Sequence, residues 1–378
     1  MTQRDDSSNP VTTDDLAGRT MLPPEGSPQS TVRLDLARLT LPPGGTVDLE
    51  SIQDGTNSYR IRTEISSDQI GQRAPRPAIA ATRLTRDQVT DADQADVEGV
   101  RSPYLPVTFV PPRVELRPNE RSMPPFDFDY ERDGELLGRP TTVYPPEDRY
   151  IYQDTAFPWC TVGRVDTPLG ASTGCTIGPR LLLTCNHAIQ WNEDGTAGWV
   201  QFRPAYYNGS TPFGEAWANE VIFWTTVAGG DGLTDLETAF DYVVCVLDEA
   251  IGDVVGYPGT RTYRDEWNGA DFLQHMGYPS DLSGAERPAF QGGAIISSVE
   301  DETAAGQTGF VLGHFNDIVR GHSGGPVWGW WGEEPWPRVV GTQSTEQTPS
   351  DDTTRGDNEF GGGPALTALV HWARANRP

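Results

Sequence analysis

The sequence contains no lysine, so all 28 of its basic residues are arginines. They face 54 acidic residues, which leaves a formal net charge of −26. A surface of this sign repels the phosphates of nucleic acids and the headgroups of anionic membranes. The composition therefore predicts a protein that binds neither of these and favours basic partners. The missing lysine is typical of a GC-rich or salt-adapted genome.

Several other features are scarce or missing. No apolar run is long enough to span a membrane, and residues 1–10 contain no signal-peptide core. No His, Cys, Asp or Glu spacing is typical of a metal site, so we expect neither metal nor cofactor. Only four cysteines are present, which allow three disulfide pairings. We expect them to be buried thiols; they are Cys160, Cys175, Cys185 and Cys245.

A glycine-rich turn carries the first candidate for chemistry. Residues 321–326 read Gly-His-Ser-Gly-Gly-Pro. Glycine permits unusual backbone angles and a close approach of two chains. Such a turn can point the N–H groups of Gly321 and Ser323 into one small space, where they could hold an oxyanion. A glycine-rich turn with a serine is also common in loops that have no such role.

A serine hydroxyl needs a base, and the base needs an orienting carboxylate. Among the five histidines, His187 follows an apolar run, residues 180–188, which reads Arg-Leu-Leu-Leu-Thr-Cys-Asn-His-Ala. Asp241 opens a run of β-formers, Phe240–Leu247. Asp235 and Glu237 lead into polar sequence, so we consider them weaker candidates for the acid.

The order His187, Asp241, Ser323 resembles that of chymotrypsin-type serine proteases. Residues 148–164 and the C-terminal stretch 364–374 are similar to the entry segment and the closing helix of the glutamyl-endopeptidase branch. The resemblance covers roughly residues 146–378. It implies a serine endopeptidase with this catalytic triad, an oxyanion hole at Gly321 and Ser323, no cofactor, and a protein or peptide substrate.

The same resemblance implies a specificity pocket. Asp317, six residues before the serine, corresponds to the pocket floor that selects Arg or Lys in trypsin. Glutamate-specific relatives use a histidine where this chain has Gln343, which argues against glutamate specificity. Glu346 and Gly361 would form further parts of the wall. His322 replaces the aspartate on which activation of trypsin depends, and we do not expect His322 to act as a base.

The predicted fold is all-β, with two six-stranded barrels of chymotrypsin type and a C-terminal helix after an irregular, partly β extension. We predict a disordered tail over residues 1–30, an N-terminal extension or pro-region over 31–145 and a protease domain over 146–378. The first barrel should span about 157–255, the second about 270–362, and the helix about 365–376. The spacing of Leu366, Leu369, Val370 and Ala373 is helical.

Alternatives stay open at this point. The chain could be a catalytically silent, protease-like binding protein, a protease with non-basic specificity, or a hydrolase that prefers esters. The N-terminal extension could be an intramolecular pro-segment, a partner-binding arm or a linker. The lack of a signal peptide favours an intracellular location, whereas the resemblance implies secretion.

Overall fold

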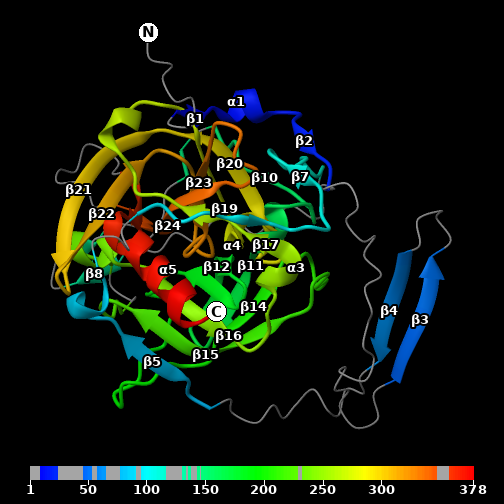
Figure 1. Cartoon of the computed structure of the whole chain (residues 1–378), viewed down its shortest axis with the longest axis horizontal. Helices are drawn as coiled ribbons and strands as arrows, with labels where there is room; N and C mark the ends of the chain where they lie inside the picture. Colours follow the sequence, from blue (N-terminus) through cyan, green and yellow to red (C-terminus); the bar gives the residue numbers. More distant parts are fainter. Residues whose placement is uncertain are drawn as a thin grey trace. The chain divides into compact units, whose positions relative to one another are not determined.

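The computed structural model describes residues 9–23, 46–52, 58–64, 77–90, 95–115, 130–132, 135–137, 143–144, 146–228, 232–346 and 357–378 (Figure 1). The chain divides into two compact units, Pro28–Pro77 and the remainder. In the smaller unit, β3 (Thr46–Ile52) and β4 (Ser58–Glu64) form an antiparallel hairpin. This hairpin falls within residues 31–145, where an irregular, partly β extension was expected.

The first barrel of the larger unit is closed. Its six strands pair in the order β14-β11-β12-β13-β16-β15, and β14 also pairs with β15. The expected six-stranded barrel is thus confirmed. The strands are β11 (Val162–Thr167), β12 (Gly170–Gly178), β13 (Leu181–Thr184), β14 (Gln201–Pro204), β15 (Ala216–Phe223) and β16 (Val243–Leu247).

The second lobe is a sheet in the order β10-β20-β19-β23-β24-β25-β22-β21. Only Ile295 separates β20 from β21, so these are two halves of one bent strand. One half lies near the beginning of the strand order and the other half lies at its end, so the bent strand connects the two edges of the sheet. Six strands then remain around the lobe, with β10 as an addition. The bounds are β10 (Tyr150–Ile151), β19 (Leu273–Gly277), β20 (Ala289–Ala294), β21 (Ile296–Ala304), β22 (Gln307–His314), β23 (Pro326–Trp331), β24 (Arg338–Glu346) and β25 (Asn358–Gly362).

Strand β13 buries apolar side chains on both of its faces. Successive side chains of a strand point to opposite faces. Leu182 enters the core of the first barrel, whereas Leu181 and Leu183 enter the core between the lobes. Both faces are therefore covered, which explains the uninterrupted leucine run. The chain leaves this strand rigidly held, three residues before His187.

Helix α5 (Pro364–Asn376) closes the chain and contacts both lobes, through β15 and β16 on one side and β22 and β25 on the other (Figure 1). Leu366, Leu369, Val370 and Ala373 are all fully buried, as their spacing predicted. The predicted C-terminal helix is confirmed. Among the described residues, no helix is long and apolar enough to cross a membrane.

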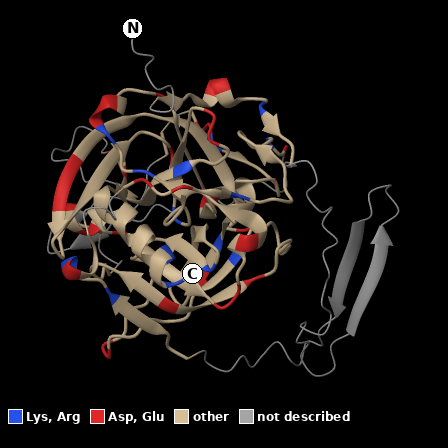
Figure 2. Cartoon of the chain, viewed as in Figure 1, with Lys and Arg blue, Asp and Glu red and all other residues tan. Residues whose placement is uncertain are grey.

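The remaining elements are short. The helices are α1 (Thr13–Leu16), α2 (Asp235–Ala239), α3 (Gly252–Val255) and α4 (Ser280–Ser283). The strands are β1 (Pro10–Val11), β2 (Thr20–Met21), β5 (Ala80–Arg83), β6 (Val100–Arg101), β7 (Val107–Thr108), β8 (Tyr130–Arg132), β9 (Glu135–Leu137), β17 (Gly256–Tyr257) and β18 (Gly259–Thr260). Figure 2 shows acidic residues along the outer strand β21, where Glu300 and Asp301 are exposed. Charge on such an edge strand discourages pairing with other chains.

The N-terminal region departs from the expected disordered tail and separate extension. Within residues 9–23, β1 pairs with β23 and β2 pairs with β7. Leu16, in an otherwise polar stretch, is 1% exposed and belongs to the core of the first barrel. Burial of Leu16 in this core holds the segment in place, although the polar composition around it predicted disorder. The remainder of residues 1–30 lies outside the described residues.

Residues 78–115 are also built into the protease-like region. Strand β5 adds to the barrel by pairing in parallel with β15. Leu84 and Val107 are completely buried, and β6 pairs with β17. The larger compact unit therefore includes Met1–Ser27 and everything from Ala78 onward, and it does not begin near residue 146.

This packing predicts a stability effect. Leu84→Ala should lower the free energy of unfolding by about 2–5 kcal/mol, because it leaves a cavity in the core. Leu22→Ala is the matched control, since Leu22 lies in the same N-terminal region but is 80% exposed. Urea unfolding of the two variants measures the difference. Equal stability of both would mean that β5 is dispensable for the fold.

Candidate active site

His187 and Asp241 form a tightly hydrogen-bonded pair. The distance from His187 Nδ1 to Asp241 Oδ2 is 2.6 Å. Asp241 is fully buried, whereas the His187 side chain is 21% exposed. Burial alone would lower the pKa of His187, but the adjacent Asp241 carboxylate outweighs it and raises that pKa well above its usual value.

The buried carboxylate of Asp241 accepts three further hydrogen bonds. The backbone N–H groups of Asn186 and His187 donate to Oδ1 at 2.9 and 2.8 Å. The Ser344 hydroxyl donates to Oδ2 at 2.6 Å. Four donors replace the water that this carboxylate loses on burial. With Oδ2 as the acceptor, Nδ1 of His187 carries a proton, and the neutral imidazole has its lone pair on Nε2.

Asn186 anchors the turn that presents His187. Its side-chain amide donates to the Thr225 carbonyl at 2.7 Å, and its Oδ1 accepts from Trp191 Nε1 and the Val227 N–H, both at 3.0 Å. The asparagine is completely buried. The step from strand β13 to the histidine is thus fixed on both sides.

The other acids near Asp241 have different tasks. Glu237 accepts from the N–H and the hydroxyl of Thr234 and so caps helix α2. Asp248 accepts from the Trp217 N–H at the far end of β16. In the part of the chain that the structure describes, neither is hydrogen-bonded to His187, which agrees with the lower rank of Glu237 as a candidate.

The serine loop bends sharply at Gly321. Its φ of +101° favours glycine. A Cβ at this position would lie 2.2 Å from the Tyr278 carbonyl oxygen, so no side chain fits. Gly324 has φ +78°, and a Cβ there would lie 2.6 Å from the backbone nitrogen of Cys185. The loop therefore packs directly against the segment that leads to His187.

Two N–H groups of this loop stand out. The N–H groups of His322, Gly324 and Gly325 all donate to backbone carbonyls. Those of Gly321 and Ser323 have no acceptor within the part of the chain that the structure describes. These are the two donors that the sequence assigns to an oxyanion hole.

The serine is held by its backbone and is partly exposed. Its carbonyl accepts from the Thr173 N–H at 2.9 Å and from the Ser172 hydroxyl at 2.6 Å. Among the described residues, no hydrogen bond joins Ser323 Oγ to His187 Nε2. Such bonds are often long in a free enzyme and shorten when substrate is bound.

His322 faces away from this chemistry. Its Nδ1 accepts the Val319 N–H at 2.9 Å, and its side chain is 1% exposed. Burial lowers the pKa of His322 well below its usual value, so the ring is neutral. It serves as a buried support of the loop.

Asp317 does not stand free in a pocket. It is 1% exposed. Its Oδ1 accepts the Tyr144 N–H at 2.6 Å, and its Oδ2 accepts from Gln291 Nε2 at 3.3 Å. Burial raises the pKa of Asp317 to about 6. Both carboxylate oxygens are therefore engaged within the protein.

Gln343 contacts His314 and carries a buried amide nitrogen that can donate a hydrogen bond. His314 Nδ1 accepts from the Asn316 N–H, and burial lowers the pKa of His314 to about 4, so its ring is neutral with the proton on Nε2. That proton is donated to Gln343 Oε1 over 3.2 Å. The amide nitrogen of Gln343 is then left buried and without a partner among the described residues.

The two other predicted wall residues do not add to a pocket. A Cβ on Gly361 would lie 2.3 Å from the Thr238 carbonyl oxygen, so this glycine packs beneath Asp241 and does not line an open wall. Glu346 ends strand β24, and its side chain lies outside the described residues.

All four cysteines are free and buried, as expected. Burial raises the pKa of Cys245 to about 12 and those of Cys160 and Cys175 as well, so these three remain thiols. Among the described residues, no group of three potential metal ligands gathers.

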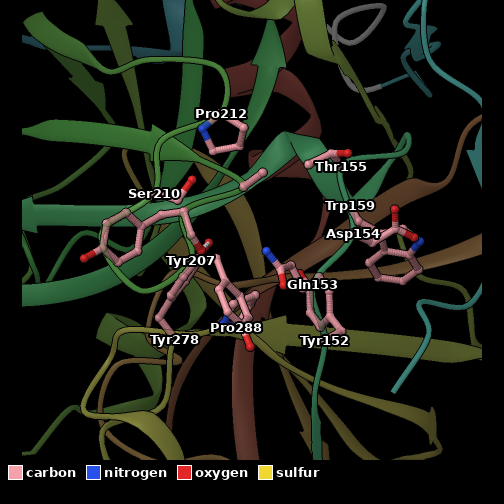
Figure 3. A pocket seen from close by; sticks show the side chains of 12 residues that line it. Tyr152, Gln153, Asp154, Thr155, Trp159, Tyr207, Ser210, Pro212, Tyr278 and Pro288 are labelled. Carbon is pink, nitrogen blue, oxygen red and sulfur yellow. Dashed lines mark hydrogen bonds between the residues drawn. The ribbon is translucent and has the colours of Figure 1, made fainter. Parts of the chain in front are cut away.

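A cavity of about 70 Å³ lies apart from the candidate catalytic residues (Figure 3). Its walls are largely aromatic and include Tyr152, Trp159, Tyr207 and Tyr278, with Gln153 among the polar groups. None of His187, Asp241 and Ser323 lines it. This volume would hold about two water molecules.

Three residues that sequence reasoning missed complete the site. Ser344 bonds Asp241 from strand β24. Ser172 and Thr173 hold Ser323 and Gly321 from strand β12, the latter through a bond of 2.6 Å to the Gly321 carbonyl. No periodicity marks these hydroxyls, because their partners lie more than a hundred residues away.

No protein-family model matches the chain. A glutamyl endopeptidase of Bacillus licheniformis is 26% identical over 188 residues. The match spans 49% of this chain and 54% of that protein, so the chain covers about half the length of this relative.

Two solved structures are also similar. A Glu endopeptidase in complex with MPD has 16% identity and a TM-score of 0.45, covering 60% of this chain and 97% of that one. The protease Anisep from Arthrobacter nicotinovorans has 17% identity and a TM-score of 0.41, covering 60% and 100%. Over the half of its length that the match to the Bacillus licheniformis protein covers, the chain resembles a serine protease of glutamyl-endopeptidase type.

Proposed function

We propose that this protein is a serine endopeptidase that cleaves peptide bonds through an acyl-enzyme. One observation carries the proposal: the His187–Asp241 pair, with its four-donor carboxylate, lies beside a serine loop in which two N–H groups have no acceptor among the described residues. A structural histidine would not need a buried carboxylate held in this way. The likeness to a named endopeptidase supports the same activity.

In this proposal, Ser323 Oγ attacks the peptide carbonyl carbon while its proton passes to His187 Nε2. Asp241 holds the imidazole and stabilises its charged form. The N–H groups of Gly321 and Ser323 stabilise the oxyanion, each such donor being worth roughly 10²–10³ in rate. Collapse breaks the C–N bond, and His187 returns the proton to the leaving amine. Water then hydrolyses the ester by the same steps.

Two other functions compete with this one. A silent, protease-like binding protein would keep the fold without turnover, and an esterase would use the same chemistry. Turnover of a peptide library by the full chain tests all three. Peptide-bond cleavage that is lost in His187→Ala supports the proposal. Ester cleavage alone would favour the esterase, and no cleavage of either kind would favour the binding protein.

For specificity, we propose a preference for side chains that accept hydrogen bonds, Glu or Gln, before the scissile bond. The buried amide nitrogen of Gln343 has no acceptor in the described parts of the chain, and such a side chain would supply one. Arg or Lys specificity, expected from Asp317, would need a free carboxylate, whereas Asp317 is bonded to Tyr144 and Gln291. The matched relative is named a glutamyl endopeptidase, which supports the same preference.

Peptides that differ only in Arg, Lys, Glu, Gln or Phe before the scissile bond test this. We expect the highest kcat/KM for Glu or Gln. Gln343→Glu replaces the donor by an acceptor of equal size, so kcat/KM for Glu peptides should fall roughly 10- to 100-fold, as for loss of a hydrogen bond to a charged group. Asp317→Ser is the comparison. An Arg or Lys preference that disappears in Asp317→Ser would restore the trypsin-like assignment.

The N-terminal region has two candidate roles, an intramolecular pro-segment or a partner-binding arm. Because β5, β6 and β7 are paired with the protease-like region and Leu84 is buried, we propose that residues 78–115 stay with the active enzyme. A pro-segment role would then belong to other parts of the first 145 residues.

A further inference from the structure

A buried thiol lies against the proposed catalytic base. Cys185 comes two residues before His187 and is completely buried. Its Sγ is 3.8 Å from His187 Nε2, the atom that must take the proton from Ser323. None of the other three cysteines contacts His187, Asp241 or Ser323 in the described part of the chain. Cys160, for example, donates to the Val255 carbonyl instead.

The thiol also reaches the serine loop through one hydroxyl. Ser172 Oγ is 3.5 Å from Cys185 Sγ and donates to the Ser323 carbonyl at 2.6 Å. A continuous polar connection therefore runs from the backbone of the nucleophile, through Ser172 and Cys185, to the base. It joins strand β12 of the first barrel, the end of β13 and the loop of the second lobe.

Sulfur suits this position chemically. Because Ser172 donates its one hydroxyl proton to the Ser323 carbonyl, the Cys185 thiol donates its proton to Ser172 Oγ, and its sulfur is free to accept weakly from protonated His187 Nε2. Its polarisable sulfur also packs well against a ring. The contact with Cys185 adds to the influence of Asp241 in favouring protonated His187.

We propose that Ser172 and Cys185 are positioning residues of the active site. Together they hold the His187 imidazole at a fixed distance from the Ser323 loop and support the imidazolium that forms during acyl transfer. This inference rests on the proposed protease function. It concerns the base and the nucleophile, and it does not involve the specificity pocket.

The test is steady-state kinetics of Cys185→Ala, Cys185→Ser and Ser172→Ala with one cleavable peptide over a range of pH. Cys185→Ala should lower kcat about three- to tenfold, the range of one weak hydrogen bond. It should leave KM unchanged, because Cys185 is buried beneath the site. The acid limb of the pH profile should move to lower pH, since a contact that favours protonated His187 is lost. Cys185→Ser should restore most of the rate.

Cys245→Ala is the matched control, because Cys245 is also a fully buried free thiol of the first barrel. It should change neither kcat nor the pH profile. The Ser172→Ala, Cys185→Ala double variant should lose less than the product of the two single effects, as expected for residues in one connection.

An unchanged kcat and pH profile in Cys185→Ala, or purely additive single effects, would overturn the inference. Thermal unfolding of each variant separates a loss of rate from a loss of fold, and the serine variant keeps the test decisive if alanine destabilises. Failure of the wild-type enzyme to cleave any peptide would instead contradict the proposed function, so the two failures are distinguishable.

Discussion

Ser323→Ala is expected to lower kcat by about 10⁶-fold, the loss seen when the nucleophile of a serine protease is removed. The alanine keeps both N–H donors of the loop and the bonds to the Ser323 carbonyl. Substrate should therefore bind with little change in affinity. Single-turnover kinetics and a binding measurement on the same peptide check the two parts of this prediction.

Ser280→Ala is a suitable control. Ser280 also lies beside the loop, because its N–H donates to the Arg320 carbonyl, but only its backbone is used there. It should keep nearly full activity. Substantial turnover in Ser323→Ala would assign the nucleophile to another residue.

Asp241→Asn is the second variant with a large expected effect. The amide cannot accept from His187 Nδ1–H in the same way, so the imidazole takes the wrong tautomer, and kcat should fall about 10⁴-fold. Ser344→Ala removes only one donor to the same carboxylate. Its effect should be much smaller, roughly tenfold or less for one hydrogen bond.

Asp241→Asn should also move the acid limb of the pH–activity profile in a defined direction. The base must be neutral to accept a proton, and Asp241 raises the pKa of His187 well above its usual value. Wild-type activity should therefore appear only as pH rises through that raised pKa. In Asp241→Asn the raising charge is gone while burial remains, so the residual activity should persist to lower pH. An acid limb that does not move would show that His187 is not the titrating group.

The elements around the proposed triad could be predicted because each follows a strong local pattern. His187 and Asp241 lie at the ends of apolar strands, and Ser323 lies in a turn that only glycines allow. Burial of both faces of β13 and β16 makes such runs conspicuous. Helix α5 could be predicted because four apolar residues recur at helical spacing and form its buried face.

The missed features depend on contacts between distant segments. Counting back from Ser323 places Asp317 at a pocket floor, but the count cannot show that Tyr144, 173 residues away, donates to its carboxylate. Leu16 is one leucine in acidic surroundings, and only its burial against the barrel reveals an ordered arm. Cys185 reads as a small apolar residue until His187 Nε2 is seen beside its sulfur.

Labelling with a fluorophosphonate, followed by mapping of the modified residue, tests the central claim most directly. The reagent requires an activated serine, because the hydroxyl oxygen must displace fluoride from phosphorus with the help of a base. We expect one adduct, on Ser323, that is absent in Ser323→Ala and forms much more slowly in His187→Ala. No adduct on Ser323 in the full chain or in a trimmed form, or labelling that does not depend on His187, would contradict it.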